Sequence, residues 1–390
     1  MIQQVSLRWN LCIKLKKIYD IIFPMIPLGK DKKVLVAMSG GVDSSVAAYI
    51  LKEQGFDLIG VHMKFWTEEQ GDEYGHLSAK DNKCCSIEGV EDARNLCDQL
   101  NIPFYVLNFR DDFKEDIVNY FISSFKNGLT PNPCVMCNKK IKFGLLYEKM
   151  KDFNAQYVAT GHYARIIKED GEFKLSRALD LSKDQSYFLH SINKSNLAST
   201  LFPIGEIKSK DEVRDIAHKA GLRVSAKKDS QEICFIPGND YKGFIERNVN
   251  IDHTPGDIVD LSGNIIGKHN GLSYYTIGQR KGIETVLIKP LYVIKKDFRN
   301  NRLIVGDIED CKTYNLTLSN INMLSDDDKM NKGTRIQVRY RGKILDIKDL
   351  HKEGDDLKIL LKDGEIGVAP GQYGVLYNEN IVIGGGVISI

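Results

Sequence analysis

The sequence predicts an α/β protein, in which a Rossmann-like parallel-sheet domain is followed by a small middle domain and a C-terminal β-barrel. In the first half of the chain, short apolar runs alternate with helical stretches of about ten residues or more. This alternation is typical of βαβ units and of a parallel sheet covered on both faces. Beyond about residue 254, short β-rich runs alternate with Gly, Asn and Asp turns, which indicates one or two small β-barrels.

The elements of the first half follow from this alternation. The predicted strands are residues 34–38, 58–63, 104–107 and 157–160. The predicted helices are residues 45–54, 87–100, 113–125 and 139–151, with a further helical pair at residues 209–222. The pattern does not indicate the order of the strands in the sheet.

Length and composition exclude little. A chain of 390 residues is expected to form two or three domains. The net charge of +2 does not indicate a nucleic-acid partner, which would require a local basic face. No apolar run is long enough to span a bilayer, so no membrane partner is expected.

The cysteines and the N-terminal residues indicate in which cellular compartment the protein is expected. Eight cysteines without a secretory signal predict a cytoplasmic protein with reduced thiols. Residues 1–31 are expected to be an N-terminal extension. They could form a targeting segment or a surface helix, and the lack of Ser- and Arg-rich composition favours the helix.

The turn Ser39-Gly40-Gly41 is a candidate anion-binding site. It follows a predicted strand and opens a predicted helix, a geometry that aims backbone N–H groups at an anion. The turn has no lysine, which excludes a Walker A loop, and it lacks the G-x-G-x-x-G spacing of dinucleotide sites. A capped tight turn would explain its glycines and serine but not the whole string SGGVDSS.

Three cysteines are candidates for chemistry. Cys134 and Cys137 have C-x-x-C spacing beside two prolines, and Cys234 lies farther along the chain. A zinc site would need a fourth ligand, which Cys84 or Cys85 could supply. A dithiol redox pair lacks a thioredoxin-like context. The third alternative is sulfur transfer, in which one thiolate carries a persulfide and another resolves it.

These strings carry a resemblance to known families. SGGVDSS resembles the pyrophosphate loop of the ATP pyrophosphatases, which split ATP into AMP and pyrophosphate while adenylating a substrate oxygen. Over residues 32–390 the chain also resembles the tRNA-specific 2-thiouridylases, which thiolate the wobble uridine of certain tRNAs. The matching blocks, in the family's order, are MSGGVDSS, MKFW, TPNPCVMCNKKIKFG, ATGHYAR, KDQSYFL, DSQEICFI, GLSYYTIGQRKG, VRYRG and GVAPGQYGVLY with GGGVI.

The resemblance implies a division into domains. A pyrophosphate-loop (PP-loop) catalytic domain that binds ATP is expected over residues 32–238. A small β-rich middle domain is expected over residues 239–303, and a C-terminal β-barrel over residues 304–390.

The resemblance also implies site residues for the nucleotide and the target base. Asp43 would help to hold Mg²⁺. The target uridine would be flipped out of its stack, as chemistry on a base requires, and its O2 would be adenylated. The ATP-binding residues would be Ala37, Met38, Ser39, Gly40, Gly41, Val42, Asp43, Ser44, Met63 and Gly161. The residues at the target base would be Asn132, Pro133 and Cys134.

Roles in sulfur transfer and tRNA contact follow in the same way. Cys234 would carry a persulfide received from a sulfur-carrier protein or a cysteine desulfurase relay. Cys137 would be the nucleophile, which closes a transient disulfide with Cys234 or releases hydrosulfide from it. The tRNA contacts would be His162, Lys183, Asp184, Gln185, Arg339, Tyr340 and Gln372. Lys183 and Arg339 can neutralise phosphates, and Tyr340 offers a stacking face for an unstacked base.

One departure from the family leaves the mechanism open. Well-studied members have an Asp, assigned to acid–base work, where this chain has Cys134. Cys134, Cys137 and Cys234 could therefore hold three irons of a [4Fe–4S] cluster, although a persulfide route is simpler. Two rivals remain outside thiolation. The first is another ATP pyrophosphatase acting on a small molecule, which would need neither the cysteines nor the β-rich C-terminal third. The second is a catalytically silent module that binds ATP and tRNA.

Overall fold

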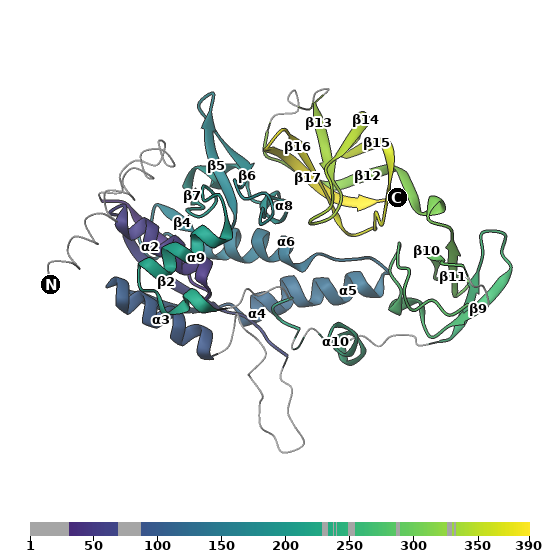
Figure 1. Ribbon diagram of the computed structural model, residues 1–390, viewed down its shortest axis with the longest axis horizontal. Coiled ribbons are helices and arrows are strands. Elements are labelled where there is room, and N and C mark those ends of the chain that lie inside the picture. Colours follow the sequence, from purple (N-terminus) through teal and green to yellow (C-terminus); the bar gives the residue numbers. More distant parts are fainter. Residues whose placement is uncertain are drawn as a thin grey trace, which may run out of the picture.

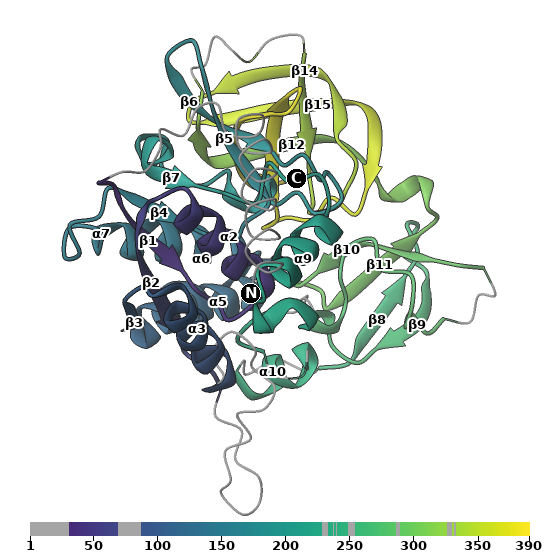
Figure 2. The same ribbon diagram turned by 60° about the vertical axis from the view of Figure 1, so that its left-hand side comes forward.

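The computed structural model of the chain describes residues 31–68, 87–227, 233–236, 238, 240–248, 254–285, 289–325, 330 and 333–390. The expected N-terminal extension, apart from Asp31, lies outside the described residues, as do Cys12, Cys84 and Cys85. Figure 1 shows an α/β domain at one end of the molecule and two β-structures at the other. Figure 2 separates these two β-structures, with β12, β14 and β15 in one and β8 to β11 in the other.

The α/β domain is built on a five-stranded parallel sheet with the strand order β3-β2-β1-β4-β7. Its strands are β1 (Lys33–Ala37), β2 (Asp57–Lys64), β3 (Phe104–Asn108), β4 (Tyr157–Ala159) and β7 (Thr200–Leu201). The predicted Rossmann-like parallel sheet is confirmed. Strand β7 was not predicted, because two residues are too short for a periodic signal. Since all five strands are parallel, their carboxyl ends meet at one edge, where such sheets bind ligands.

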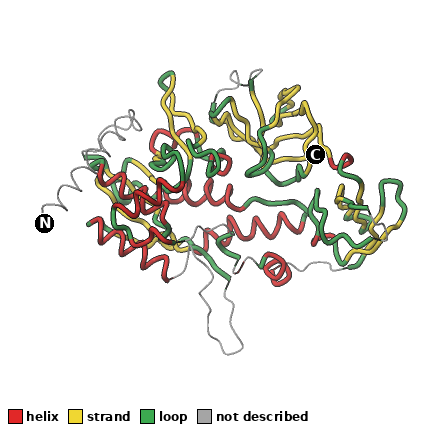
Figure 3. The backbone as a smooth tube through the Cα atoms, in the orientation of Figure 1, coloured by secondary structure: helices red, strands yellow, loops and turns green. Residues whose placement is uncertain are grey.

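Alternate side chains of β1, the central strand of the sheet, enter two separate hydrophobic cores. Val34 and Val36 pack toward the first core, and Leu35 and Ala37 pack toward the second, as the two-residue period of a strand requires. Helices of the first core are α2 (Val42–Glu53), α3 (Ile87–Leu100) and α9 (Lys210–Lys219). Figure 3 shows helices around the strands of this domain, whereas strands dominate the other end. No helix in the described ranges is long and apolar enough to cross a membrane.

Two long helical stretches cover the second core, and both begin earlier than predicted. The first comprises α4 (Arg110–Phe113), the π-helical segment η2 (Lys114–Asn119) and α5 (Tyr120–Lys126). The second comprises α6 (Pro133–Cys137), the π-helical segment η3 (Asn138–Leu145) and α7 (Leu146–Glu148). This stretch was predicted from residue 139 but begins at Pro133. The Asn132 side chain accepts a hydrogen bond from Val135 N, and proline is favoured at the first helical position.

The remaining part of the chain forms two β-structures. The middle one is a four-stranded sheet of order β10-β11-β8-β9, with β8 (Gly256–Val259), β9 (Ile265–His269), β10 (Tyr292–Asp297) and β11 (Arg302–Gly306). The C-terminal one is a closed barrel of six strands, because β12 pairs with both β15 and β17. Its strands are β12 (Lys312–Met323), β13 (Thr334–Gln337), β14 (Leu345–Glu353), β15 (Asp356–Ile366), β16 (Tyr373–Asn378) and β17 (Ile381–Ser389). The predicted small β-barrel at the C-terminus is confirmed.

Short elements complete the described fold. A hairpin of the α/β domain, β5 (Ala164–Glu169) and β6 (Glu172–Arg177), joins the barrel sheet where Ser176 pairs with Ile381. The other short elements are α8 (Ser186–Leu189), η4 (Lys194–Ser199), η5 (Arg223–Ala226), α10 (Tyr241–Asn248), η7 (Leu272–Tyr274) and η8 (Glu309–Cys311).

The interface between the α/β domain and the barrel contains a buried histidine with an altered pKa. The His190 ring lies 5.1 Å from the Tyr373 ring, and its Nδ1 lies 2.7 Å from Tyr187 O. Burial lowers the pKa of His190 to about 4, so the ring is neutral at pH 7. The unfolded chain, with the pKa of an ordinary histidine near 6.5, binds more protons than the folded chain between these two values.

This difference predicts an acid-labile interface. The contribution of neutral His190 is fully present above pH ~6.5 and is lost as the pH falls toward ~4, at a cost on the order of 3 kcal/mol. Denaturant unfolding measured at several pH values should show this loss in the wild type. His190→Gln, which cannot titrate, should show a shallower dependence over the same range. Equal slopes in the two proteins would assign the acid loss to other groups.

Candidate active site

One cavity of about 300 Å³ opens at the carboxyl edge of the sheet. It is lined by residues of β2, by the turn after β1, by the segment after β4, by α6 and by residues 233–235. The structure therefore brings together most of the predicted nucleotide, base and sulfur residues. Those that line the cavity are Ala37, Met38, Ser39, Asp43, Ser44, Met63, Pro133, Cys134, Cys137, Gly161, His162, Gln185 and Cys234.

The turn after β1 has the backbone geometry expected of an anion site. Gly40 has a φ of 72°, and a Cβ on it would lie 2.4 Å from Gly89 O of α3, so only glycine fits here. Gly41 is the N-cap residue of α2, with Val42 at the first helical position. No described side chain caps this end of the helix. Its first N–H groups can therefore serve an anionic ligand.

Gly161 holds the segment after β4 against this turn. A Cβ on Gly161 would lie 2.5 Å from Ser44 N and 2.6 Å from the carbonyl carbon of Asp43. A side chain therefore cannot fit here without moving the first turn of α2. The glycine is needed for close backbone approach, and this approach helps to define the floor of the cavity.

Lys210, from helix α9, faces the turn after β1, which itself contains no lysine. Lys210 Nζ, from the first turn of α9, lies 2.8 Å from Asp43 Oδ1 and 2.9 Å from Asp43 Oδ2. Tyr163 Oη donates a third hydrogen bond to Asp43, at 2.8 Å. The Lys210 side chain is only 10% exposed, so its charge is directed inward at the carboxylate. Sequence reasoning missed Lys210 and Tyr163, because no local motif links them to the turn.

The three candidate cysteines meet in the cavity from two directions. Cys134 and Cys137 lie in the first turn of the α6 stretch, where a spacing of three places them on neighbouring positions of one face. Cys134 is exposed, Cys137 is buried and Cys234 is half-buried. Cys234 lines the same cavity beside Phe235, whose ring packs against aromatic rings of the second core. These rings belong to Phe113, Phe121 and Phe244, with centroid distances of 5.8, 5.5 and 5.5 Å.

The donor set of the cavity bears on the metal alternatives. Within the described ranges, no three His, Cys, Asp or Glu side chains are grouped closely enough to hold a metal ion. For zinc, the suggested recruits Cys84 and Cys85 lie outside the described residues.

A histidine and a lysine form a polar pair on the same cavity wall. Lys142 Nζ lies 3.4 Å from His162 Nε2, and His162 Nδ1 lies 2.6 Å from Thr160 Oγ1. Desolvation, with the nearby Lys142 charge, holds the pKa of His162 well below its usual value. The neutral ring can accept a hydrogen bond from Lys142 and donate one to Thr160. Lys142 was not predicted, although it lies in the block TPNPCVMCNKKIKFG.

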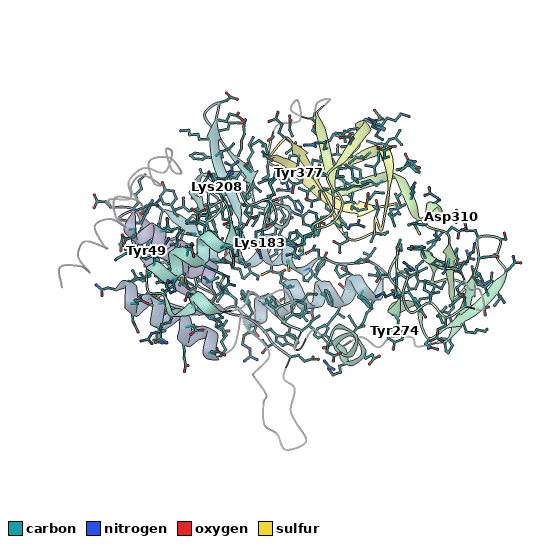
Figure 4. All side chains as sticks on the ribbon, viewed as in Figure 1. Tyr49, Lys183, Lys208, Tyr274, Asp310 and Tyr377 are labelled. Atoms are coloured by element: carbon teal, nitrogen blue, oxygen red, sulfur yellow. The ribbon has the colours of Figure 1, made fainter. Side chains whose placement is uncertain are left out.

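The predicted tRNA segment after β6 is largely internal. Asp184 is buried and accepts hydrogen bonds from Ala178 N at 2.9 Å and Ser186 Oγ at 2.8 Å. Gln185 Oε1 accepts a hydrogen bond from Tyr163 N at 2.9 Å. Lys183 is half-buried, and Figure 4 labels it near the middle of the molecule. Asp184 and Gln185 therefore stabilise the fold around the cavity, whatever else they contact.

The predicted tRNA residues of the barrel lie outside the cavity. Arg339 is exposed and donates hydrogen bonds to Ile366 O at 2.7 Å and Glu365 Oε1 at 2.9 Å. The half-buried Tyr340 ring packs on Phe188, a residue of the cavity wall, at a centroid distance of 4.2 Å. The barrel thus reaches the rim of the cavity through Tyr340. Their roles toward tRNA stay predictions.

Comparisons with known proteins match the whole described architecture. Three family models match in succession: a tRNA methyl transferase HUP domain over residues 32–238, a tRNA methyl transferase PRC-barrel domain over residues 242–307, and an aminomethyltransferase β-barrel domain over residues 313–388. Among solved structures, the U34-tRNA thiolase NcsA from Methanococcus maripaludis with its [4Fe-4S] cluster is 21% identical. That alignment covers 55% of this chain and 65% of the other, with a TM-score of 0.35.

Curated relatives match at much higher identity. The tRNA-specific 2-thiouridylase MnmA of Clostridioides difficile (strain 630) is 44% identical over 363 residues, which cover 92% of this chain and 98% of the relative. The MnmA of Clostridium perfringens (strain 13 / Type A) is 44% identical over 359 residues, with the same two coverages. Identity of this extent spans both the catalytic cavity and the barrel. The chain therefore belongs to the tRNA-specific 2-thiouridylase MnmA family.

Proposed function

We propose that the chain is an ATP-dependent tRNA-uridine 2-sulfurtransferase, which converts the wobble uridine of tRNA to 2-thiouridine and releases AMP and pyrophosphate. The observation that carries this proposal is the single cavity that joins an anion-binding turn to three cysteines. Family membership agrees with it, and a nucleotide-binding module alone would not need the thiols. A small-molecule synthetase would need neither the thiols nor the barrel that reaches the rim of the cavity.

The turn and its surroundings fit ATP. The free N–H groups at the start of α2 would bind the pyrophosphate portion, and Met63 and Gly161 would line the space beside the adenosine. Mg²⁺ usually takes one or two carboxylates and completes its shell with water and substrate phosphates. Asp43 therefore suffices on the protein side, and the bound ion would neutralise phosphate charge. Lys210 and Tyr163 orient the Asp43 carboxylate, and Lys210 adds positive charge beside it.

The cysteines would act after adenylation of the uridine O2. The terminal sulfur of a persulfide on Cys234 attacks C2 of the base, and AMP leaves with the bonding electron pair. The Cys137 thiolate then attacks Sγ of Cys234, which forms a Cys137–Cys234 disulfide and leaves sulfur on the base as 2-thiouridine. An external dithiol must reduce this disulfide before the next turnover. The persulfide sulfur comes from a sulfur-carrier protein or a cysteine desulfurase relay.

The target base would enter beside Asn132, Pro133 and Cys134, at the start of α6. The rest of the tRNA would contact Lys183 of the α/β domain and Arg339 and Tyr340 of the barrel, since Tyr340 packs on Phe188 of the cavity wall. His162 lines the cavity itself, so its contact would be with the flipped nucleotide. A neutral His162 can donate or accept a hydrogen bond but adds no charge there.

Sulfur incorporation tests the proposal. Unmodified tRNA, ATP and a radiolabelled sulfur source should give labelled tRNA under anaerobic conditions with the wild type. Omission of ATP, or the variant Cys234→Ser, should reduce the label to background. Cys311→Ser is the matched control, because Cys311 is a buried thiol outside the cavity, and it should leave the label unchanged. Binding of ATP and tRNA without any label would instead favour the catalytically silent module.

The same preparation decides between persulfide and cluster chemistry. Iron at background in anaerobically purified, active protein would exclude the [4Fe–4S] alternative. Iron that is stoichiometric with the protein and lost on substitution of Cys134, Cys137 or Cys234 would contradict the persulfide proposal.

A further inference from the structure

The connection between α5 and α6 lies against both β-structures. Figure 1 shows it running beneath the barrel and reaching toward β10 and β11 before it returns to α6. At its far end Gly128 meets the middle domain, where a Cβ would lie 2.3 Å from the Phe298 ring. The connection ends at Asn132, and α6 begins at Pro133, immediately before Cys134. The cavity cysteines are thus preceded by a segment that the accessory domains contact.

The contact with the barrel is a set of hydrogen bonds. Thr130 N donates to Pro370 O at 2.8 Å, and Gln372 Nε2 donates back to Thr130 O at 3.1 Å. Asn132 Nδ2 donates to Gln372 Oε1 at 3.5 Å. The Gln372 side chain therefore uses both ends of its amide within the protein.

The second of these contacts continues into the helix of the cysteines. Asn132 Oδ1 accepts a hydrogen bond from Val135 N at 3.4 Å, which makes Asn132 the N-cap residue of α6. Its amide can cap α6 and bond Gln372 at the same time only in one orientation. Gln372, on the barrel, thereby fixes the residue that starts the helix bearing Cys134 and Cys137.

A glycine allows the barrel to come this close. Gly371 has a φ of 89°, and a Cβ on it would lie 2.8 Å from Leu129 Cβ and 3.0 Å from Thr130 N. Any side chain here would push the barrel loop away from the segment that it supports. The close contact between the barrel loop and residues 129–130 therefore requires glycine at position 371.

We propose that Gln372 is a positioning residue, which holds the start of α6 through Thr130 and Asn132, so that the barrel sets the place of the reactive cysteines. The inference rests on the proposed function for its catalytic consequence. The predicted role of Gln372 as a tRNA contact stays a separate prediction, which the experiment below distinguishes from positioning. Misplacement of a reacting group by about 1 Å can lower a rate by about 100-fold. Loss of the Gln372 hydrogen bonds to Thr130 and Asn132 should lower the rate by less than this.

The test separates positioning from tRNA binding. Gln372→Ala should lower kcat for thiolation about 10-fold and leave KM for tRNA within about twofold of the wild-type value. In protein without tRNA, amide hydrogen exchange over residues 128–137 should become faster, since the bonds at Thr130 and Asn132 are lost. Gly371→Ala should have both effects. Gly354→Ala is the matched control, because Gly354 is a barrel glycine with a φ of 61° and open space around its Cβ position.

Two results would overturn the proposal. One is a raised KM for tRNA with unchanged kcat and unchanged exchange in Gln372→Ala, which would make Gln372 a tRNA contact. The other is an equal effect of Gly354→Ala, which would indicate general loss of barrel stability. If the wild type incorporates no sulfur, the proposed function fails. Hydrogen exchange over residues 128–137 then tests only whether Gln372 holds the start of α6. Faster exchange in Gln372→Ala would support this positioning, and unchanged exchange would reject it.

Discussion

Gly161→Ala should abolish most of the ATP-dependent activity, with a loss of about 100-fold in AMP formation. The added methyl group would lie 2.5 Å from Ser44 N, a backbone atom that cannot move alone. Either the first turn of α2 or the segment after β4 must shift, and both line the cavity. Since the anion site consists of backbone N–H groups, such a shift misplaces all of them together. AMP release in the presence of tRNA and a persulfide donor measures the effect.

The matched control is Gly171→Ala in the turn between β5 and β6. This glycine has a φ of 82° and no atom within 4 Å of its Cβ position, so the change adds backbone strain without a collision. It should leave AMP formation near the wild-type rate. Wild-type rates for Gly161→Ala as well would show that the turn tolerates displacement and would contradict the assignment of its N–H groups.

Lys210→Met should lower AMP formation by about 100-fold at saturating tRNA. Methionine preserves much of the length of lysine but removes the charge that lies between 2.8 and 2.9 Å from both Asp43 oxygens. The Asp43 carboxylate would then be oriented by the Tyr163 hydrogen bond alone, and the site would lose a positive charge beside the phosphates. Loss of this attraction would weaken ATP binding, so KM for ATP should rise as well. Steady-state kinetics with varied ATP separates the two effects.

Lys208→Met provides the control for this charge. Lys208 lies two positions before Lys210, is exposed, and carries the same formal charge; Figure 4 labels it on the α/β domain. Its loss should change neither kcat nor KM by more than about twofold, since a solvated charge contributes little. Equal effects of the two substitutions would indicate a diffuse attraction for nucleotide and would remove Lys210 from the site.

The parts of the site that could be predicted are those that local sequence determines. The turn at Gly40 was recognisable because an apolar strand, a glycine pair and a helix start fall within one short string, and the structure gives Gly40 a φ of 72°. Cys134 and Cys137 were recognisable from their spacing. Resemblance placed Cys234 with them, and the structure does so through Phe235, whose aromatic contacts come from three other helical elements.

The parts that could not be predicted depend on contacts between distant segments. Lys210 and Asp43 are 167 positions apart, and Asn132 and Gln372 are 240 apart. Neither pair leaves a periodic or spacing signal, because each depends on how α9 and the barrel pack against the sheet. The start of α6 was also missed. Its N-cap is an asparagine before a proline, which reads equally well as a turn.

The joining of the hairpin β5–β6 to the barrel sheet means that the catalytic fragment of this chain is not a separable unit. Tyr187 Oη donates a hydrogen bond to Tyr373 O across the same interface, and both side chains are buried. A protein ended after β11 would leave this hydroxyl in an apolar surface without its acceptor, and the outer edge of β6 without a partner. Such a fragment would be prone to aggregate by edge pairing. An exchange of the barrel for another domain would therefore have to rebuild both the pairing of Ser176 with Ile381 and the acceptor for Tyr187 Oη.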